Sequence, residues 1–279
     1  MTPRTNTEAH GSVTVLKLGG ELLEDADAMK VAARGIRTLM ASGPVVVVHG
    51  GGRAIDADLR ARGKSPQFVD GLRVTDADTL DTVVGVLAGG INTAFVAAVN
   101  AAGVRAVGLT GADAGVGLSA VAPPLAATSG AMVDLGLVGI PREDAPVTLV
   151  ADMVRLGYVP VIACVGVTAD GVLLNVNADV LASHLARAMN ATQLIIAGKT
   201  AGVFDATGAT CERLDAQEAR DMVQAGTARD GMVAKLGACL QAIDGGAQTV
   251  RIVDGRIGDY QAGPGTTIVG STDREYTKC

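Results

Sequence analysis

The sequence predicts an α/β protein, an αβα sandwich built on an open and mainly parallel central sheet. Three observations point to this fold class. Short apolar runs alternate with longer segments of helical periodicity, which is the rhythm of repeated strand–helix units. Hydrophobic residues make up 48% of the 279 residues, and tryptophan is absent, so the core must consist mainly of small aliphatic side chains. Such a core suits parallel strands that are buried on both faces and read as continuous valine, isoleucine and leucine runs.

The alternation gives an expected order of elements along the chain. Strands are expected at residues 13–18, 45–48, 106–109, 159–163, 193–197 and 249–253. Helices are expected at residues 26–41, 54–62, 76–101, 148–156, 178–189, 216–224 and 232–244. The longest helix carries its own start signal, because Thr75 can act as the N-cap and Asp78 can supply the acid of a capping box.

Charge and cysteine usage argue against several classes of protein. The net charge is -6 and the pI is about 5.1, whereas a nucleic-acid-binding domain carries a basic footprint. The four cysteines are scattered without a C-x-x-C pair, so neither a zinc site nor a disulfide framework is expected, and no metal ligands are assigned.

Residues 1–12 lack the apolar core of a secretory signal, and no segment is expected to span a bilayer. We therefore expect a cytoplasmic protein with neither nucleic acid nor membrane as a partner.

Two segments that contain glycine and proline interrupt the alternation. Residues 64–73 and 111–138 are patchily apolar and are expected to form hairpins or loops set on the sheet, where ligand contacts usually concentrate. A second run of strands and helices begins near residue 171. We therefore divide the chain into one lobe of residues 13–166 and another of residues 167–269.

Two of the expected strands run straight into glycines. The first carries K-L-G-G from Lys17, and the second carries H-G-G-G from His49 and opens a helix. Backbone N–H groups of glycine can approach an anion closely, and ligands of open parallel sheets bind at the carboxyl ends of the strands. Two tight strand-to-helix turns would give the same pattern, but the repetition and the lysine favour phosphate binding. Neither motif is a Walker loop or a dinucleotide fingerprint, and we interpret His49 as a structural hydrogen-bonding residue.

Two lysines are candidates for the same crevice. Lys17 lies within an apolar strand, where an ammonium is costly unless it emerges at an end or meets an anion. Strand alternation places Lys17 on the face of Gly19, so it can reach the glycine turn. Lys235 lies in D-G-M-V-A-K at the beginning of a helix, and taken alone it reads as a solvated helix lysine.

Polar side chains gather at two further helix starts. The segment N-V-N-A-D offers Asn175, Asn177 and Asp179 where one cap would suffice, although Asn177 as a simple N-cap is the plainer interpretation. Arg73, in G-L-R-V-T, precedes the long helix and could clasp a carboxylate through two N–H groups. A surface arginine at a helix start is the more common explanation in general.

Together these motifs resemble the amino-acid kinase superfamily and, within it, the N-acetyl-glutamate kinases of arginine biosynthesis. The match runs in order through nearly the whole chain, and G-L-R-V-T is the part most typical of the acetyl-glutamate branch. Its motifs are K-L-G-G at Lys17, H-G-G-G at His49, G-L-R-V-T at Gly71, N-V-N-A-D at Asn175 and D-G-M-x-x-K at Asp230. The resemblance implies the amino-acid kinase fold and ATP-dependent phosphorylation of the γ-carboxylate of N-acetyl-L-glutamate to an acyl phosphate.

The resemblance also implies roles for individual residues. Lys17 and Lys235 would offset charge on the transferring phosphoryl group, Asp179 would hold the two lysines in place, and N–H groups of Gly20 and Gly51 would bind the same oxygens. The lobe of residues 13–166 would bind the acyl amino acid. The predicted substrate contacts, which also draw on the start of the second lobe, are Gly51, Gly52, Arg73, Asn175 and Asn177. The lobe of residues 167–269 would carry most of the ATP, and the predicted phosphate and nucleotide contacts are Gly19, Gly20, Gly50, Lys199, Gly202, Asp230, Gly231 and Met232.

The chemistry of the implied reaction fits these residue types. A carboxylate with a pKa near 4 is already a nucleophile at neutral pH, so no general base is needed. The reaction instead needs two anions to be aligned and their charge compensated, which lysines, glycine amides and Mg²⁺ on ATP provide.

Three positions depart from the family pattern. Lys199 follows Gly198 where Thr-Asp or Ser-Asp is usual, Thr93 stands where a lysine is common, and Ala112 replaces the lysine of a common Gly-Lys-Asp. Lys199 either weakens ATP binding by reversing a charge or contacts a phosphate. These departures keep two alternatives open: a kinase for another N-blocked acidic amino acid such as N-acetyl-aminoadipate, or a catalytically weak amino-acid-binding regulatory relative. By resemblance, the expected assembly is a homodimer formed through the first lobe.

Overall fold

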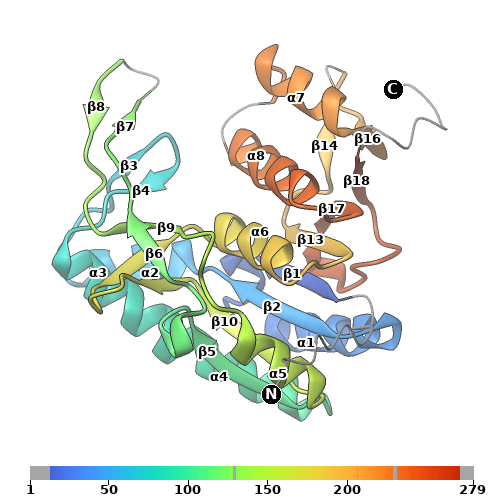
Figure 1. The fold of residues 1–279 in the computed structure, drawn as a ribbon, viewed down its shortest axis with the longest axis horizontal. Coiled ribbons are helices and arrows are strands. Elements are labelled where there is room, and N and C mark those ends of the chain that lie inside the picture. The colour runs from blue at the N-terminus through green and yellow to red at the C-terminus, as the bar shows by residue number, and fades with distance from the viewer. Residues whose placement is uncertain (1–12, 128–129, 206, 229–230, 271–279) are drawn as a thin grey trace, which may run out of the picture.

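An eight-stranded sheet forms the centre of the computed structural model, which describes residues 13–127, 130–205, 207–228 and 231–270 (Figure 1). Its strand order is β16-β18-β17-β13-β1-β2-β10-β5, and every neighbouring pair is parallel except β17 with β18. The strands are β1 (Thr14–Leu18), β2 (Val45–His49), β5 (Ala106–Thr110), β10 (Val159–Ala163), β13 (Gln193–Gly198), β16 (Arg213–Asp215), β17 (Thr249–Asp254) and β18 (Gly265–Val269). The predicted fold class and the six predicted strands are confirmed.

Helices cover both faces of this sheet. One layer contains α1 and α4, which contact each other, and the opposite layer contains α6 and α8 (Figure 1). The helices outside the long helix described below are α1 (Ala26–Leu39), α2 (Gly52–Ala61), α5 (Thr148–Arg155), α6 (Ala178–Ala188), α7 (Ala216–Gln224) and α8 (Gly231–Asp244). Each predicted helix is found within two residues of its expected bounds, apart from short 3-10 turns at the ends.

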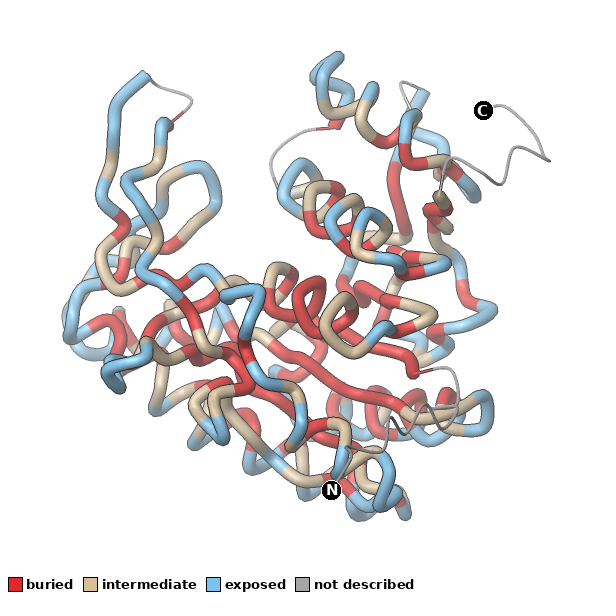
Figure 2. Tube along the Cα trace, viewed as in Figure 1, coloured by how far each residue is buried: buried red, intermediate tan, exposed pale blue. Residues whose placement is uncertain are grey.

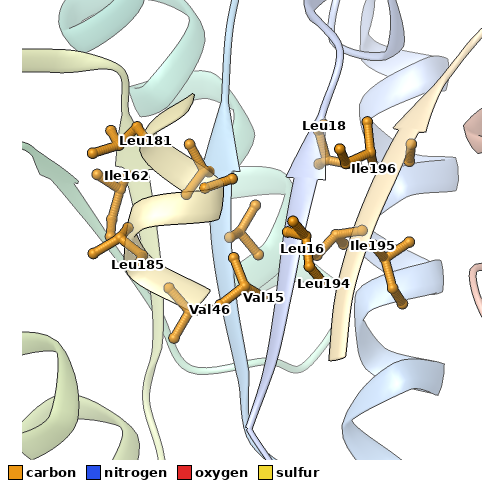
Figure 3. Packing of buried hydrophobic residues seen from close by; sticks show 14 of the residues in the cluster. Val15, Leu16, Leu18, Val46, Ile162, Leu181, Leu185, Leu194, Ile195 and Ile196 are labelled. Atoms are coloured by element: carbon orange, nitrogen blue, oxygen red, sulfur yellow. The ribbon is translucent and has the colours of Figure 1, made fainter. Parts of the chain in front are cut away.

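Alternating side chains of the central strands supply both faces of the core. Every residue of β1, β2 and β10 is buried, as the continuous apolar runs predict (Figure 2). Val15 lies on the side of α6, as does Val46 of the neighbouring strand, whereas Leu16 and Leu18 point to the opposite side (Figure 3). Residue 17 shares the face of Val15, so the strand directs Lys17 towards the helix layer that contains α6.

The long predicted helix is continuous but changes its winding. It consists of α3 (Ala77–Val84), a π-helical segment (Gly85–Ile91, η3) and α4 (Asn92–Ala101). The predicted N-cap is wrong: Asp76 is the cap, and its carboxylate accepts the N–H of Thr79 at 2.8 Å. Thr75 is instead buried, and its hydroxyl donates to the carbonyl of Arg73. A carboxylate one residue later competes successfully for the cap position.

This helix also corrects the expectation that no segment is apolar and long enough to span a membrane. In the described part of the chain, the helix Ala77–Ala101 meets that criterion by length and composition alone, with 25 residues. Its inner face packs into the core, where Phe95 and Val99 are fully buried. Only 39% of its most apolar stretch is buried, so an apolar outer face remains.

The segments that interrupt the alternation form hairpins at one end of the sheet. Residues 64–73 contain the predicted hairpin, formed by β3 (Phe68–Val69) and β4 (Leu72–Arg73). A four-stranded sheet and a second hairpin follow, and both hairpins project from the same end of the body (Figure 1). These strands are β6 (Ser119–Val121), β9 (Val138–Pro141), β11 (Val165–Val167) and β12 (Leu173–Val176) in the sheet, and β7 (Leu125–Ala126) and β8 (Met132–Val133) in the hairpin. A further small hairpin, β14 (Val203–Phe204) with β15 (Thr210–Cys211), lies beyond β13.

Candidate active site

Lys17, Asp179 and Lys235 meet at the carboxyl end of β1. Lys17 Nζ lies 2.8 Å from Asp179 Oδ1, and Lys235 Nζ lies 4.0 Å from Asp179 Oδ2. Asp179 belongs to the first turn of α6, and Lys235 to the first turns of α8. Three elements therefore bring the three predicted residues together, although they are widely separated in the sequence.

Burial and charge have opposite effects on this cluster. Burial by itself would lower the pKa of Lys17, but the adjacent Asp179 carboxylate more than offsets it and raises the pKa above its ordinary value of 10.5. Burial would likewise raise the pKa of Asp179, and the charges of Lys17 and Lys235 bring it below 3.8. The three groups therefore carry two positive charges and one negative charge at neutral pH, and the surplus positive charge suits an anionic ligand.

The two glycine motifs lie against each other beside this cluster. A Cβ atom on Gly20 would lie 2.5 Å from the Cα of Gly51, and a Cβ on Gly51 would lie 2.5 Å from the side chain of Ile91. Gly20 therefore needs to be glycine for the two backbones to approach, whereas a side chain at Gly51 would have to displace the end of Ile91. The helix α2 begins at Gly52 without a side-chain cap at Gly51, so the N–H groups of its first turn are available to an anion.

Arg73 is buried and oriented by its neighbours. Its Nη2 donates to Asp56 Oδ1 at 2.6 Å and to the carbonyl of Gly52 at 3.2 Å, and its guanidinium carbon lies 4.6 Å from the centre of the Phe68 ring. Its Nη1 is buried and has no hydrogen-bond partner within the part of the chain that the structure describes. An unpaired buried N–H group is costly, so Nη1 is the group available to a ligand carboxylate. The interpretation of Arg73 as a surface arginine is wrong, since only 8% of it is exposed.

Asp56 and Phe68 were not predicted from the sequence. Asp56 lies one helical turn after Gly52 on α2 and orients Arg73 from there, while Phe68 faces Arg73 across the β3–β4 hairpin. A carboxylate four residues after a glycine motif is common on exposed helices, so the sequence offers only a weak signal. The pairing of Phe68 with Arg73 would follow from an exact hairpin register, which the sequence does not specify.

The two asparagines of N-V-N-A-D have different positions. Asn177 is the N-cap of α6, and its Oδ1 accepts the N–H groups of Asp179 and Val180 at 2.8 and 3.2 Å. Asn175 lies on β12 and donates through Nδ2 to Thr75 Oγ1 at 3.0 Å. Thr75 lies two residues beyond Arg73, so the structure places Asn175 beside the β4–α3 segment.

The predicted nucleotide contacts lie at the ends of β13 and around the start of α8. Lys199 is exposed directly after β13, and Gly231 and Met232 open α8. Gly202 has a φ of +112°, and a Cβ there would lie 2.5 Å from Thr266 Oγ1. The backbone conformation and the packing therefore require glycine at this position, whether or not it contacts a nucleotide. The predicted contact Asp230 lies outside the described residues.

His49 is a structural residue. It is completely buried; its Nδ1 lies 3.2 Å from the carbonyl of Gly50, and its Nε2 lies 3.0 Å from Asn92 Nδ2. Burial lowers the pKa of His49 to about 4, so the ring is neutral at physiological pH. Donation from Nδ1 and acceptance at Nε2 satisfy both nitrogens of one tautomer.

Comparison with known proteins identifies the family. The sequence profile of the amino acid kinase family matches residues 12–254 of the chain. The chain belongs to the amino acid kinase family. Among similar proteins of this family, the acetylglutamate kinase of Symbiobacterium thermophilum is 39% identical over 255 residues, covering 90% of this chain and 86% of that protein. The acetylglutamate kinase of Bordetella avium is 38% identical over 251 residues, covering 89% and 83%.

Solved structures share the fold of this amino acid kinase. N-acetylglutamate synthase from Neisseria gonorrhoeae, complexed with coenzyme A and N-acetyl-glutamate, superposes with a TM-score of 0.79 at 24% identity and covers 93% of this chain and 60% of that chain. Giardia carbamate kinase superposes with a TM-score of 0.68 at 16% identity, covering 94% and 100%. At these identities the likeness concerns the fold alone.

The cluster suits the phosphoryl transfer that defines a kinase. Two lysines lie on either side of one carboxylate, beside glycine turns and a helix N-terminus that favour anions. A group so arranged can stabilise negative charge that spreads over phosphoryl oxygens. Asp179 is held between the two lysines and is ionised, so it is poorly suited to act as a general base.

Proposed function

We propose that this amino acid kinase transfers the γ-phosphoryl group of ATP to the γ-carboxylate of N-acetyl-L-glutamate in arginine biosynthesis. The single observation that carries the proposal is the Lys17–Asp179–Lys235 cluster at the end of β1. Relatives at 36 to 39% identity over almost the whole chain are acetylglutamate kinases, which supports this acceptor. The product would be an acyl phosphate.

The residues divide into three tasks. Lys17 and Lys235 compensate charge on the transferring phosphoryl group, while Asp179 keeps both lysines directed into the crevice. The N–H groups of Gly20 and Gly51 bind the same oxygens.

The acceptor lies on the side of α2 and the β3–β4 hairpin. Arg73 presents Nη1 to the α-carboxylate of the substrate, and Gly51, Gly52 and Asn175 line the remainder of its site. Asn177 contributes mainly by capping α6 and so fixing Asp179, because its Oδ1 is already engaged. The γ-carboxylate is ionised at neutral pH and attacks directly, without a general base.

ATP is held by the second lobe, around Lys199, Gly202 and the start of α8. The described residues contain no cluster of three or more His, Cys, Asp or Glu side chains that could enclose a metal ion. The single carboxylates near the site fit Mg²⁺ that arrives already bound to the nucleotide. Mg²⁺ commonly keeps several waters and binds through phosphate oxygens and one or two carboxylates. When bound, the ion would neutralise part of the charge on the phosphate chain.

Trapping with hydroxylamine tests the proposal, because an acyl phosphate is converted to a hydroxamate, which gives a coloured complex with iron(III). The purified protein is incubated with Mg-ATP and, in separate reactions, acetyl-glutamate, acetyl-aminoadipate, acetyl-aspartate or free glutamate. We expect hydroxamate with acetyl-glutamate in preference to the others, and none when ATP is omitted. A different preferred acceptor would reassign the substrate, and no hydroxamate with any acceptor would favour a non-catalytic binding protein.

We also propose that the chain acts in the cytoplasm as a homodimer formed through its first lobe. The supporting features are the exposed edge of β5 and the apolar outer face of the helix Ala77–Ala101. The cysteines Cys164 and Cys239 are free and buried, which suits a reducing compartment. Light scattering after size exclusion should give twice the chain mass of 28.0 kDa, and a single-chain mass at every concentration would contradict the dimer.

A further inference from the structure

A carboxylate lies where the proposed nucleotide site would be expected to exclude one. Glu21 directly follows Gly20 in a short 3-10 turn (Gly20–Leu22), and its side chain folds back over the end of β1. A Cβ atom on Gly19 would lie 2.5 Å from both carboxylate oxygens of Glu21, and one on Gly198 would lie 3.1 Å from Oε1. The carboxylate therefore covers the ends of β1 and β13, the two neighbouring strands between which the phosphates are proposed to bind.

Other carboxylates at this edge of the sheet are fully engaged. Asp179 is shared by two lysines, and Asp254, at the end of β17, accepts Nε and Nη2 of Arg256. Glu21 differs in its direct contacts: its Oε1 accepts the backbone N–H of Lys199 at 3.2 Å, it forms no ion pair among the described residues, and its charge acts on the Lys17 ammonium only from a longer distance. Glu21 thus keeps a negative charge with unused acceptor capacity beside the phosphate crevice.

This charge has opposite effects on the two forms of the nucleotide. Metal-free ATP would bring additional negative charge towards the half-buried carboxylate of Glu21, and the two like charges would repel each other. A nucleotide that carries a divalent cation would bring positive charge to the same place, and a carboxylate oxygen is a preferred ligand of Mg²⁺. The nearby ammonium groups of the exposed Lys199 and of Lys17 would attract both forms.

We propose that Glu21 makes nucleotide binding depend on a divalent cation, by directing its carboxylate at the metal of the bound metal–nucleotide complex. This inference rests on the proposed function, because it assumes that ATP binds at the ends of β1 and β13. It adds a residue that selects metal-bearing nucleotide over free nucleotide, a task distinct from the charge compensation by Lys17 and Lys235.

The test is a binding measurement and does not depend on turnover. Titration calorimetry measures the Kd of the non-hydrolysable analogue AMP-PNP with saturating Mg²⁺ and, separately, with excess EDTA. The ratio of the two Kd values gives the coupling between metal and nucleotide. It is determined for the wild type, for Glu21→Gln, which keeps an oxygen acceptor but loses the charge, and for Glu21→Ala, which loses both.

Glu24→Gln serves as the matched control. Glu24 lies three residues away and pairs with Arg53 at 2.6 Å, in a groove lined by α2 and the π-helical segment. Its removal changes the net charge by the same amount without altering the crevice. We expect this variant to keep the coupling of the wild type.

The expected result for Glu21→Gln is a coupling ratio about tenfold smaller than that of the wild type, with tighter binding in EDTA. An unchanged ratio in Glu21→Gln would overturn the inference. So would a Glu21→Ala variant that weakens both Kd values equally while Glu21→Gln matches the wild type, because the carboxylate would then only hold the backbone of Lys199. If the wild type binds AMP-PNP neither with saturating Mg²⁺ nor with EDTA, the proposed function is overturned, and this inference with it.

Discussion

Replacing Asp179 by asparagine should destabilise the fold because it leaves Lys17 buried without its counter-charge. The two side chains are about equally buried, with exposed fractions of 10% for Lys17 and 8% for Asp179, and their charged atoms lie 2.8 Å apart. Lys235 is less dependent on the carboxylate, since 24% of its side chain is exposed and the distance is 4.0 Å. The cost of Asp179→Asn therefore falls mainly on Lys17.

Removing one partner of a buried ion pair costs about 3–5 kcal/mol. At roughly 2–4 °C per kcal/mol for a chain of this size, the expected loss in Tm is about 6–20 °C. The pH dependence of the free energy of unfolding should change as well. In the wild type the lowered pKa of Asp179 and the raised pKa of Lys17 give stability that is present between about pH 4 and pH 10.5 and is lost outside that window.

In Asp179→Asn, burial is the largest influence that remains on Lys17 and outweighs the smaller effect of Glu21. It pushes the pKa of Lys17 below 10.5, so the unfolded state binds more protons than the folded state. The free energy of unfolding of this variant should therefore rise as the pH increases from 7 to 10, whereas that of the wild type stays level over this range. Urea denaturation at several pH values measures both quantities.

The double variant Lys17→Met with Asp179→Asn separates this cause from a general loss of packing. Because it removes the unpaired charge, it should recover the loss and be more stable than Asp179→Asn by about 3–5 kcal/mol. If Asp179→Asn unfolds within 0.5 kcal/mol of the wild type, or if adding Lys17→Met destabilises it further, the buried-pair reasoning is refuted.

Two other contacts of the site lead to separate expectations. Asp56→Ala should raise the KM for the acyl amino acid about tenfold with an unchanged KM for ATP, because Arg73 loses a charge-assisted hydrogen bond, and Asp56→Asn should recover most of this loss. Equal KM values for Asp56→Ala and the wild type would show that Arg73 needs no such support. Since burial lowers the pKa of His49 to about 4 from 6.5, the unfolding free energy should fall by about 3 kcal/mol as the pH drops from 6.5 to 4, and His49→Gln should flatten that slope while preserving turnover at pH 7. A wild-type stability that is level across this range would contradict the neutral buried ring.

The central elements of the fold could be predicted because each carries a local signal. The strands of small aliphatic residues and the helices between them are visible as apolar runs and periodic patterns. The direction of Lys17 could also be predicted, since strand alternation alone fixes the face on which it lies.

Contacts between distant elements could not be predicted in the same way. The sequence does not identify the N-cap of α3, because Thr75 and Asp76 are both good caps. The choice depends on the burial of Thr75, whose hydroxyl accepts a hydrogen bond from Asn175. The support of Arg73 by Asp56 depends on how α2 packs against the β3–β4 hairpin. The position of Glu21 over Gly198 likewise follows from the pairing of β1 with β13, which the order of motifs does not reveal.

The most direct test of the account is the kcat of Lys235→Ala with both substrates saturating, together with the Kd of each substrate. A charge-compensating group acts mainly in the transition state, so kcat should fall by about 10²–10³-fold while both Kd values change little and the Tm is retained. A kcat within threefold of the wild type would contradict the assignment of Lys235, and with it the charge compensation proposed for the Lys17–Asp179–Lys235 cluster.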